Sequence, residues 1–77
     1  MNTRLQELLA RTWQVSADQI TAQTAQGDIP AWDSQGHLDL IMNLEATFGV
    51  ELELAEAVEM RSVAAIEAAL RRRRVLD

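Results

Sequence analysis

Cysteine, aromatic residues and long apolar runs are what this sequence of 77 residues lacks or has in small number. Without cysteine the chain can form neither a disulfide framework nor a thiolate zinc site. Because only two tryptophans and one phenylalanine are present, the core must be mainly aliphatic, which suits packed helices. No apolar stretch approaches the ~18 residues of a membrane-spanning helix, so we expect no membrane association.

A recognisable signal peptide is missing as well, since no charged region followed by an apolar run opens the sequence. Together with the absence of cysteine, this fits a reducing compartment, and we expect a cytoplasmic protein. The length predicts one domain over residues 1–77, which would bury only ~60% of the surface of its unfolded chain. We expect a monomer.

Basic residues are missing from the middle of the chain, although the net charge is only −5. Residues 33–59 contain seven acids and no lysine or arginine, whereas residues 71–74 are four consecutive arginines. The acidic middle should repel nucleic acid and attract basic protein surfaces. Because cations stabilise the C-terminal end of a helix, we interpret the arginine run as a solvated helix end and expect residues 71–77 to fray. We predict no nucleic-acid partner.

The first helix is predicted over residues 4–14, where leucines and a tryptophan recur at helical spacing. Thr3 would cap it, because the segment Thr3-Arg4-Leu5-Gln6 matches a capping box. Residues 15–31 lose this periodicity, so we predict a long loop with a short helical turn near residues 17–20. Three apolar side chains should pin this loop: Val15, Ile20 and Ile29.

A second helix is predicted over residues 34–48, with Gly49 ending it and either Asp33 or Ser34 as its N-cap. Residues 50–54 alternate as in a strand, but no second strand is available to pair with them, so we interpret them as an extended linker. A short third helix follows over residues 54–59, and Ser62 caps a fourth. The pattern predicts an all-α, small four-helix bundle with three main helices and one short helix.

The predicted core follows from the helical faces. A turn of about 100° per residue places an apolar stripe on the second helix and leaves Leu40 and Met42 on its flanks, partly exposed. Glu45 falls inside the stripe, so we expect it at a rim or paired, since a buried lone carboxylate is costly. The predicted core comprises Leu5, Leu8, Leu9, Ile20, Leu38, Ile41, Leu44, Phe48, Leu52, Val58, Met60, Val63, Ile66 and Leu70.

Ser34 carries the main functional alternatives. In one interpretation it only caps the second helix, a position that serine favours. In the other its hydroxyl carries a group, and a phosphate would suit the free N–H groups and positive dipole at a helix N-terminus. Asp33 could then help to recruit a divalent cation while the group is attached.

A hydrolytic site is the competing hypothesis, because Asp33, Ser34 and His37 are at most four positions apart. Side chains along one helical face do not converge on a substrate atom, however, and no oxyanion hole is evident. Asp33 and His37 also lack a third ligand for a metal ion. We therefore interpret His37 as a surface or loop-packing residue, and we predict no catalytic residue and no metal site.

Trp32 precedes the second helix and also has two interpretations. It can act as a hydrophobic staple that packs near residue 37 or 38 and fixes the entry of the chain into the helix. Alternatively, it forms part of a partner-docking patch with Leu38 and Met42. The acidic residues of the segment 39–59 have no basic neighbours, which favours a docking face over an ordinary solvated surface.

From about residue 3 to residue 70, the chain resembles the acyl carrier proteins. The resemblance centres on Asp33-Ser34 and on a segment without a gap from Ala57 to Val63, which matches the third helix of the family and the start of its fourth. The helix after the serine carries the remaining matched positions: Leu38, Leu40-Ile41-Met42, Leu44-Glu45 and Phe48-Gly49-Val50-Glu51-Leu52.

This resemblance implies that Ser34 is the attachment point of 4′-phosphopantetheine. A phosphopantetheinyl transferase would move this group from coenzyme A with the help of Mg²⁺, and Asp33 would take part in recognition by the transferase and its Mg²⁺. The thiol of the arm would hold an acyl or aminoacyl group as a thioester. A ligase or transferase would load this group, and downstream enzymes of fatty-acid, polyketide or related specialised biosynthesis would use it. Besides Asp33, the partner-docking residues that it implies are Leu38, Asp39, Met42 and Glu45.

The sequence also departs from the family pattern. Gln35 stands where leucine usually follows the serine, and three neutral residues stand at positions that are often acidic in fatty-acid carriers: Gly36, Ala46 and Thr47. The residues around Ser34 are more similar to discrete carriers of specialised metabolism, so we expect a polyketide, modified-acyl or aminoacyl carrier. The alternative is a small helical interaction module in which Ser34 is only a helix cap.

Overall fold

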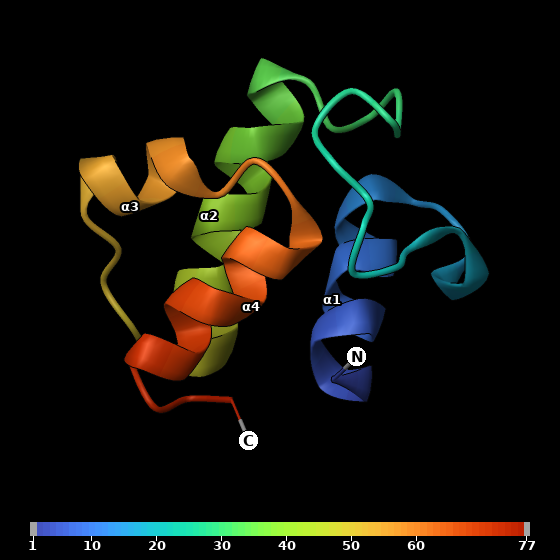
Figure 1. The fold of residues 1–77 in the computed structure, drawn as a ribbon. Helices are drawn as coiled ribbons and strands as arrows, with labels where there is room; N and C mark the ends of the chain where they lie inside the picture. The colour runs from blue at the N-terminus through green and yellow to red at the C-terminus, as the bar shows by residue number, and fades with distance from the viewer. Residues whose placement is uncertain (1, 77) are drawn as a thin grey trace.

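The computed structural model describes residues 2–76, which form four α-helices and no strand or sheet (Figure 1). The helices are α1 (Thr3–Trp13), α2 (Ser34–Phe48), α3 (Leu54–Glu59) and α4 (Val63–Arg72). A short 3₁₀ helix, η1 (Ala17–Gln19), lies in the long loop between α1 and α2, where a helical turn was predicted. The predicted all-α bundle with one short helix is therefore confirmed.

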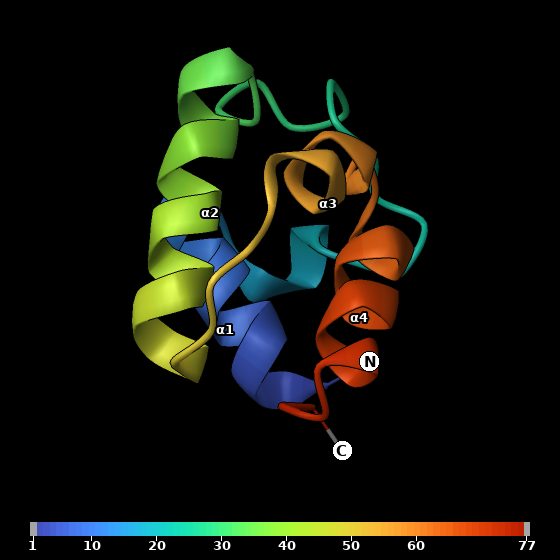
Figure 2. The same cartoon turned by 90° about the vertical axis from the view of Figure 1, so that its left-hand side faces the viewer.

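The short helix α3 is the element that departs from the direction of the bundle. It lies across the view in Figure 1 and is seen end-on in Figure 2, so it runs roughly perpendicular to α2. The start of α1, the end of α2 and the end of α4 lie together at one end of the molecule, and the start of α2 lies at the other. None of the helices in the described chain is long and apolar enough to cross a membrane.

Side-chain caps define where three of the helices begin. Asp33 Oδ1 accepts a hydrogen bond from Gly36 N at 2.9 Å and so caps α2, while Ser62 caps α4 as predicted. The predicted Thr3 cap of α1 is wrong by one residue. The side-chain oxygen Oδ1 of Asn2 accepts a hydrogen bond from Leu5 N at 3.0 Å. Asn2 is therefore the cap, since its amide oxygen reaches a free N–H group of the first turn, and Thr3 is the first helical residue.

The core contains most of the predicted residues, but the buried face of α2 is rotated from the predicted stripe. Leu40 is 0% exposed, whereas Leu38, predicted to lie in the core, is 59% exposed. Val58 on α3 was also wrongly predicted to be buried. The cause is packing against α1, which takes the row of α2 residues spaced four apart: Gly36, Leu40, Leu44 and Phe48. Four further residues complete the core: Trp13, Ile29, Trp32 and Ala69.

The long loop between α1 and α2 is ordered by apolar side chains and by backbone hydrogen bonds. Ile20 and Ile29 are buried and Val15 packs against the core, as predicted. In addition, Gln26 N donates to Arg61 O at 2.8 Å, and Val63 N donates to Thr24 O at 2.8 Å. These bonds tie the loop to the start of α4.

Candidate functional site

Ser34 is the first residue of α2, and its side chain is exposed to solvent. The hydrogen bond that caps the helix is made by Asp33, so Ser34 does not serve as the cap. Its hydroxyl is hydrogen-bonded to no other described residue. The sequence left Asp33 and Ser34 as alternative caps, and the structure resolves that choice and leaves the Ser34 oxygen accessible.

Gly36 gives the start of α2 its close contact with the preceding loop. A Cβ atom at this position would lie 1.8 Å from the carbonyl oxygen of Ala31. Gly36 O also accepts a hydrogen bond from the indole N–H of Trp13 at 3.3 Å. The sequence showed Gly36 only as a departure from an acidic position, although a glycine inside a helix is itself a signal of close backbone approach.

His37 links the start of α2 to α3 and to Trp32. The Nε1–H group of Trp32 donates to His37 Nδ1 at 3.0 Å, and His37 Nε2 lies 2.7 Å from Ala57 O. Because an indole nitrogen only donates and a carbonyl oxygen only accepts, the His37 proton belongs on Nε2. Both ring nitrogens are therefore engaged with groups other than Ser34.

Trp32 behaves as the predicted hydrophobic staple. It precedes the cap of α2, and its ring lies edge to edge with that of His37, the fourth helical residue, with ring centroids 6.3 Å apart and planes 10° apart. Its other neighbour is Trp13, at 4.4 Å between ring centroids. Trp32 is only 1% exposed, so the alternative placement of its side chain in a docking patch is wrong.

An apolar groove of about 400 Å³ separates α2 from α3, and we call it the α2–α3 groove. It begins about one helical turn beyond Ser34. Its lining residues are His37, Leu38, Ile41, Glu45, Leu52, Leu54, Ala57 and Val58. His37 and Val58 also line a neighbouring recess of about 540 Å³ near Arg61. Six of the eight lining residues of the groove are apolar, whereas three of the five residues that line the recess are polar or charged.

Of the predicted docking residues, Leu38 and Glu45 line this groove, and Asp39 and Met42 are exposed on the same helix. Leu38 and Met42 are exposed on α2, the latter by 66%, and two apolar residues of α3 that were not predicted to be at the surface extend the patch: Leu54 and Val58. Asp39 is exposed and accepts a hydrogen bond from Gln35 Nε2 at 3.2 Å. Gln35, unusual for the resembled family, thus contacts one of the predicted docking carboxylates.

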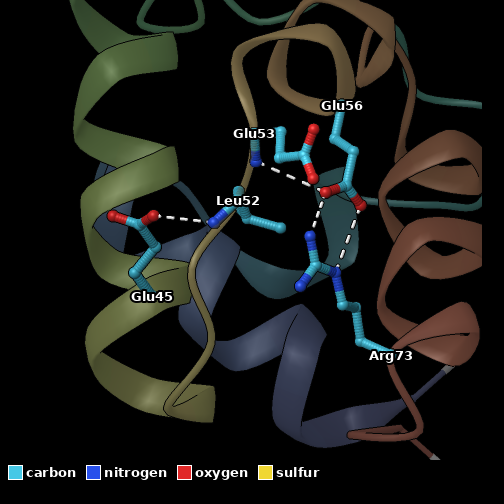
Figure 3. Close-up of polar contacts among 5 residues, drawn as sticks. All are labelled: Glu45, Leu52, Glu53, Glu56 and Arg73. Carbon is cyan, nitrogen blue, oxygen red and sulfur yellow. Dashed lines mark hydrogen bonds and ion pairs between the residues drawn. The ribbon is translucent and has the colours of Figure 1, made fainter.

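Glu45 lies at the rim of the groove, half-buried, as predicted. Its Oε2 atom accepts a hydrogen bond from the backbone N–H of Leu52 at 2.9 Å, which fixes the linker between α2 and α3 (Figure 3). This hydrogen bond satisfies the carboxylate, which its apolar neighbours in the groove could not do.

An ion pair joins α3 to the residue after α4. Arg73 donates through its Nη2 atom to Glu56 Oε1 and through Nε to Oε2 at 3.3 Å, as Figure 3 shows. The hydrogen bond from Arg73, then that from the Glu53 backbone, lowers the pKa of Glu56 below its ordinary value of 4.5. In return, the hydrogen bond to Glu56 raises the pKa of Arg73.

The lowered pKa of Glu56 predicts how stability depends on pH and how arginine variants should change the titration of this carboxyl group. The contribution of the folded-state carboxylate to stability is present above pH 4.5 and is lost as the pH falls through the lowered pKa. Arg72 also lowers this pKa by its charge, while Glu51 and Glu53 act on Arg73. In a carboxyl-carbon NMR titration, Glu56 should titrate below 4.5 in the wild type, and Arg73→Gln should move its pKa toward 4.5. A smaller shift is expected in Arg72→Gln, and equal shifts in the two variants would contradict the assignment.

No three side chains of histidine, aspartate or glutamate gather in residues 2–76 in a way that could hold a metal ion. A comparison with protein-family models finds none that matches this chain, and a comparison with curated proteins finds no matching relative. Support for a function therefore comes from the site geometry and from the sequence features around Ser34.

Proposed function

We propose that this protein is a carrier protein, in which the Ser34 hydroxyl bears 4′-phosphopantetheine and the thiol of that arm holds an acyl or aminoacyl group as a thioester. The observation that carries the proposal is the exposed, unbonded hydroxyl of Ser34, one helical turn before an apolar groove. A phosphodiester on Ser34 would lie at the positive end of a helix of 15 residues. The resemblance to acyl carrier proteins supports the same assignment.

The α2–α3 groove suits the apolar part of a carried group. Its volume of about 400 Å³ lies within the range of small-molecule sites, roughly 300–1,000 Å³, and its lining is mainly aliphatic. A group on a flexible arm from Ser34 would enter the groove past His37 and Leu38. Burial of its apolar surface would stabilise it by about 25 cal/mol per Å².

The surface around the groove suits transient docking of enzymes. Asp33 and Asp39 are exposed acids close to Ser34, and Leu38 and Met42 provide apolar contact area. Acidic groups at such a surface speed encounter with basic partner surfaces. In this proposal the partners are the phosphopantetheinyl transferase, the loading enzyme and the downstream biosynthetic enzymes. The few charges here fit a specialised polyketide, modified-acyl or aminoacyl pathway.

Modification of Ser34 can be tested by intact mass. The unmodified protein is incubated with coenzyme A, Mg²⁺ and a broad-specificity phosphopantetheinyl transferase. The wild type should gain the mass of one phosphopantetheine, and Ser34→Ala should gain none. Ser16→Ala is the matched control, because Ser16 is exposed and its hydroxyl is used as a local cap. No gain in the wild type, or an equal gain in Ser34→Ala, would refute the proposal.

A small helical interaction module is the second candidate, and the exposed apolar patch of α2 and α3 favours it. Because Asp33 provides the cap, the helix does not need the Ser34 hydroxyl for this purpose. This candidate predicts no mass gain and unchanged partner binding in Ser34→Ala. The mass experiment therefore separates the two candidates.

A further inference from the structure

No residue of α3 itself is buried, so its position depends on polar contacts and on the apolar residues that flank it, Leu52 before and Met60 after. Of the four α-helices, α3 alone has no buried residue, and its Leu54 and Val58 side chains are 81% and 52% exposed. An element with so little apolar burial opens more easily than the core helices. Three side-chain polar contacts attach α3 and its linker to α2 and to the end of α4: Glu45 to Leu52, His37 to Ala57, and Arg73 to Glu56.

Arg73 is held in place by the way in which α4 ends. Arg74 adopts a left-handed conformation with φ 60°, Arg74 N donates to Arg71 O at 2.9 Å, and Val75 N donates to Leu70 O at 3.1 Å. This pair of bonds is a Schellman motif, which closes a helix C-terminus. Val75 also packs against the core. The backbone at Arg73 is therefore anchored on both sides.

Glu56 joins two structural roles in one carboxylate. Its Oε1 atom accepts a hydrogen bond from Glu53 N at 3.3 Å, at the start of α3, and both of its oxygens accept from Arg73 (Figure 3). Two-point contact between a guanidinium and a carboxylate is the stronger form of this interaction. The start of α3 is thus tied to the end of α4, although the two residues are 17 positions apart.

From these contacts we infer that Arg73 holds α3 closed over the α2–α3 groove and that the Arg73–Glu56 contact controls access of the carried group to the groove. The nature of that group rests on the proposed function, whereas the attachment of α3 does not. Arg71, in contrast, pairs with Glu67 inside α4, at 3.3 Å. Within the arginine run, Arg73 is therefore a positioning residue that acts on α3, whereas Arg71 pairs within its own helix.

Backbone amide exchange in the unmodified protein tests the attachment of α3. In Arg73→Gln, amides of residues 54–59 should exchange about two- to fivefold faster than in the wild type, the range expected for one exposed ion pair. Amides of α1 should not change. Arg72→Gln is the matched control, because it removes the same charge from an exposed side chain that forms no side-chain hydrogen bond or ion pair with the described residues. Equal exchange of α3 in these two variants would overturn the inference.

Glu56→Gln provides an independent variant, since glutamine can still accept the hydrogen bond from Glu53 N but cannot form the ion pair. Its effect on α3 exchange should match that of Arg73→Gln, and the double variant should add nothing further. Additive effects would show that the two residues act separately and would contradict a shared contact.

Access to the groove is tested on protein that carries an octanoyl thioester on its arm. Hydroxylamine attacks the thioester carbonyl, the C–S bond breaks, and a hydroxamate and a free thiol are formed. Cleavage should be about two- to fivefold faster in Arg73→Gln than in Arg72→Gln. Equal rates would refute control of access. If Ser34 accepts no arm, the proposed function fails, but the exchange experiment still decides whether Arg73 holds α3.

Discussion

Gly36→Ala should destabilise the protein by about 3 kcal/mol, at the upper end of the usual cost of overpacking. The added Cβ would lie 1.8 Å from Ala31 O and 2.9 Å from its carbonyl carbon. Both of these atoms belong to the backbone, so no side-chain rotation relieves the clash. Alanine favours a helix over glycine by about 1 kcal/mol, which acts in the opposite direction. A net loss of stability in urea denaturation would therefore report the steric contact itself.

Gly49→Ala is the matched control for this experiment. It adds the same methyl group at the end of the same helix, where nothing lies within 4 Å of the new Cβ atom. Its cost should come only from the left-handed conformation at φ +66°, about 1–2 kcal/mol. If Gly36→Ala were as stable as the wild type, the close approach of the Ala31 loop to α2 would be incorrect.

Local sequence signals were sufficient to predict most helix ends. Gly49 ends α2 in the left-handed conformation, and Ser62 caps α4, as their residue types favour. At the start of α1, two neighbouring residues, Asn2 and Thr3, can both act as caps. The choice between them depends on which oxygen reaches Leu5 N, and a sequence pattern does not specify that geometry.

The buried face of α2 could not be predicted in the same way. The helix carries apolar residues at positions 38, 40, 41, 42 and 44, so more than one stripe is possible. Packing against α1 buries Leu40, and α3 leaves Leu38 exposed at the groove. Tertiary contacts therefore decide between stripes of similar hydrophobicity, and the resulting groove is visible only in the structure.

Among the site residues, too, some features follow from local sequence and others depend on tertiary contacts. The placement of Glu45 at a rim follows from local pattern, whereas local pattern does not decide between Asp33 and Ser34 as the cap of α2. The contact of Arg73 with Glu56 joins positions 17 residues apart and has no periodic signature. The arginine run was interpreted only as a charged helix end, because helix-dipole arguments do not identify a distant partner.

Trp32→Ala should cost about 3–5 kcal/mol, the range for truncation of a buried aromatic side chain. Trp32 is 1% exposed, stacks on Trp13, and donates a hydrogen bond to His37. A chain of this length has a total stability of roughly 4–12 kcal/mol, so the variant should lie close to the limit of folding. Urea denaturation followed by circular dichroism measures the loss, and a cost below 1 kcal/mol would contradict this packing.

Trp32→Phe separates the role of the ring from that of its N–H group. Phenylalanine retains stacking but leaves His37 Nδ1 without its donor, which should cost about 1–3 kcal/mol. Because His37 Nε2 contacts Ala57 O, loss of its orientation should also speed amide exchange in α3. Trp13→Phe is the matched control, since it removes a hydrogen bond to Gly36 O on the other side of the tryptophan pair. Faster α3 exchange in the position-32 variant alone would show that Trp32 acts on α3 through His37, whereas equal exchange in both variants would exclude that link.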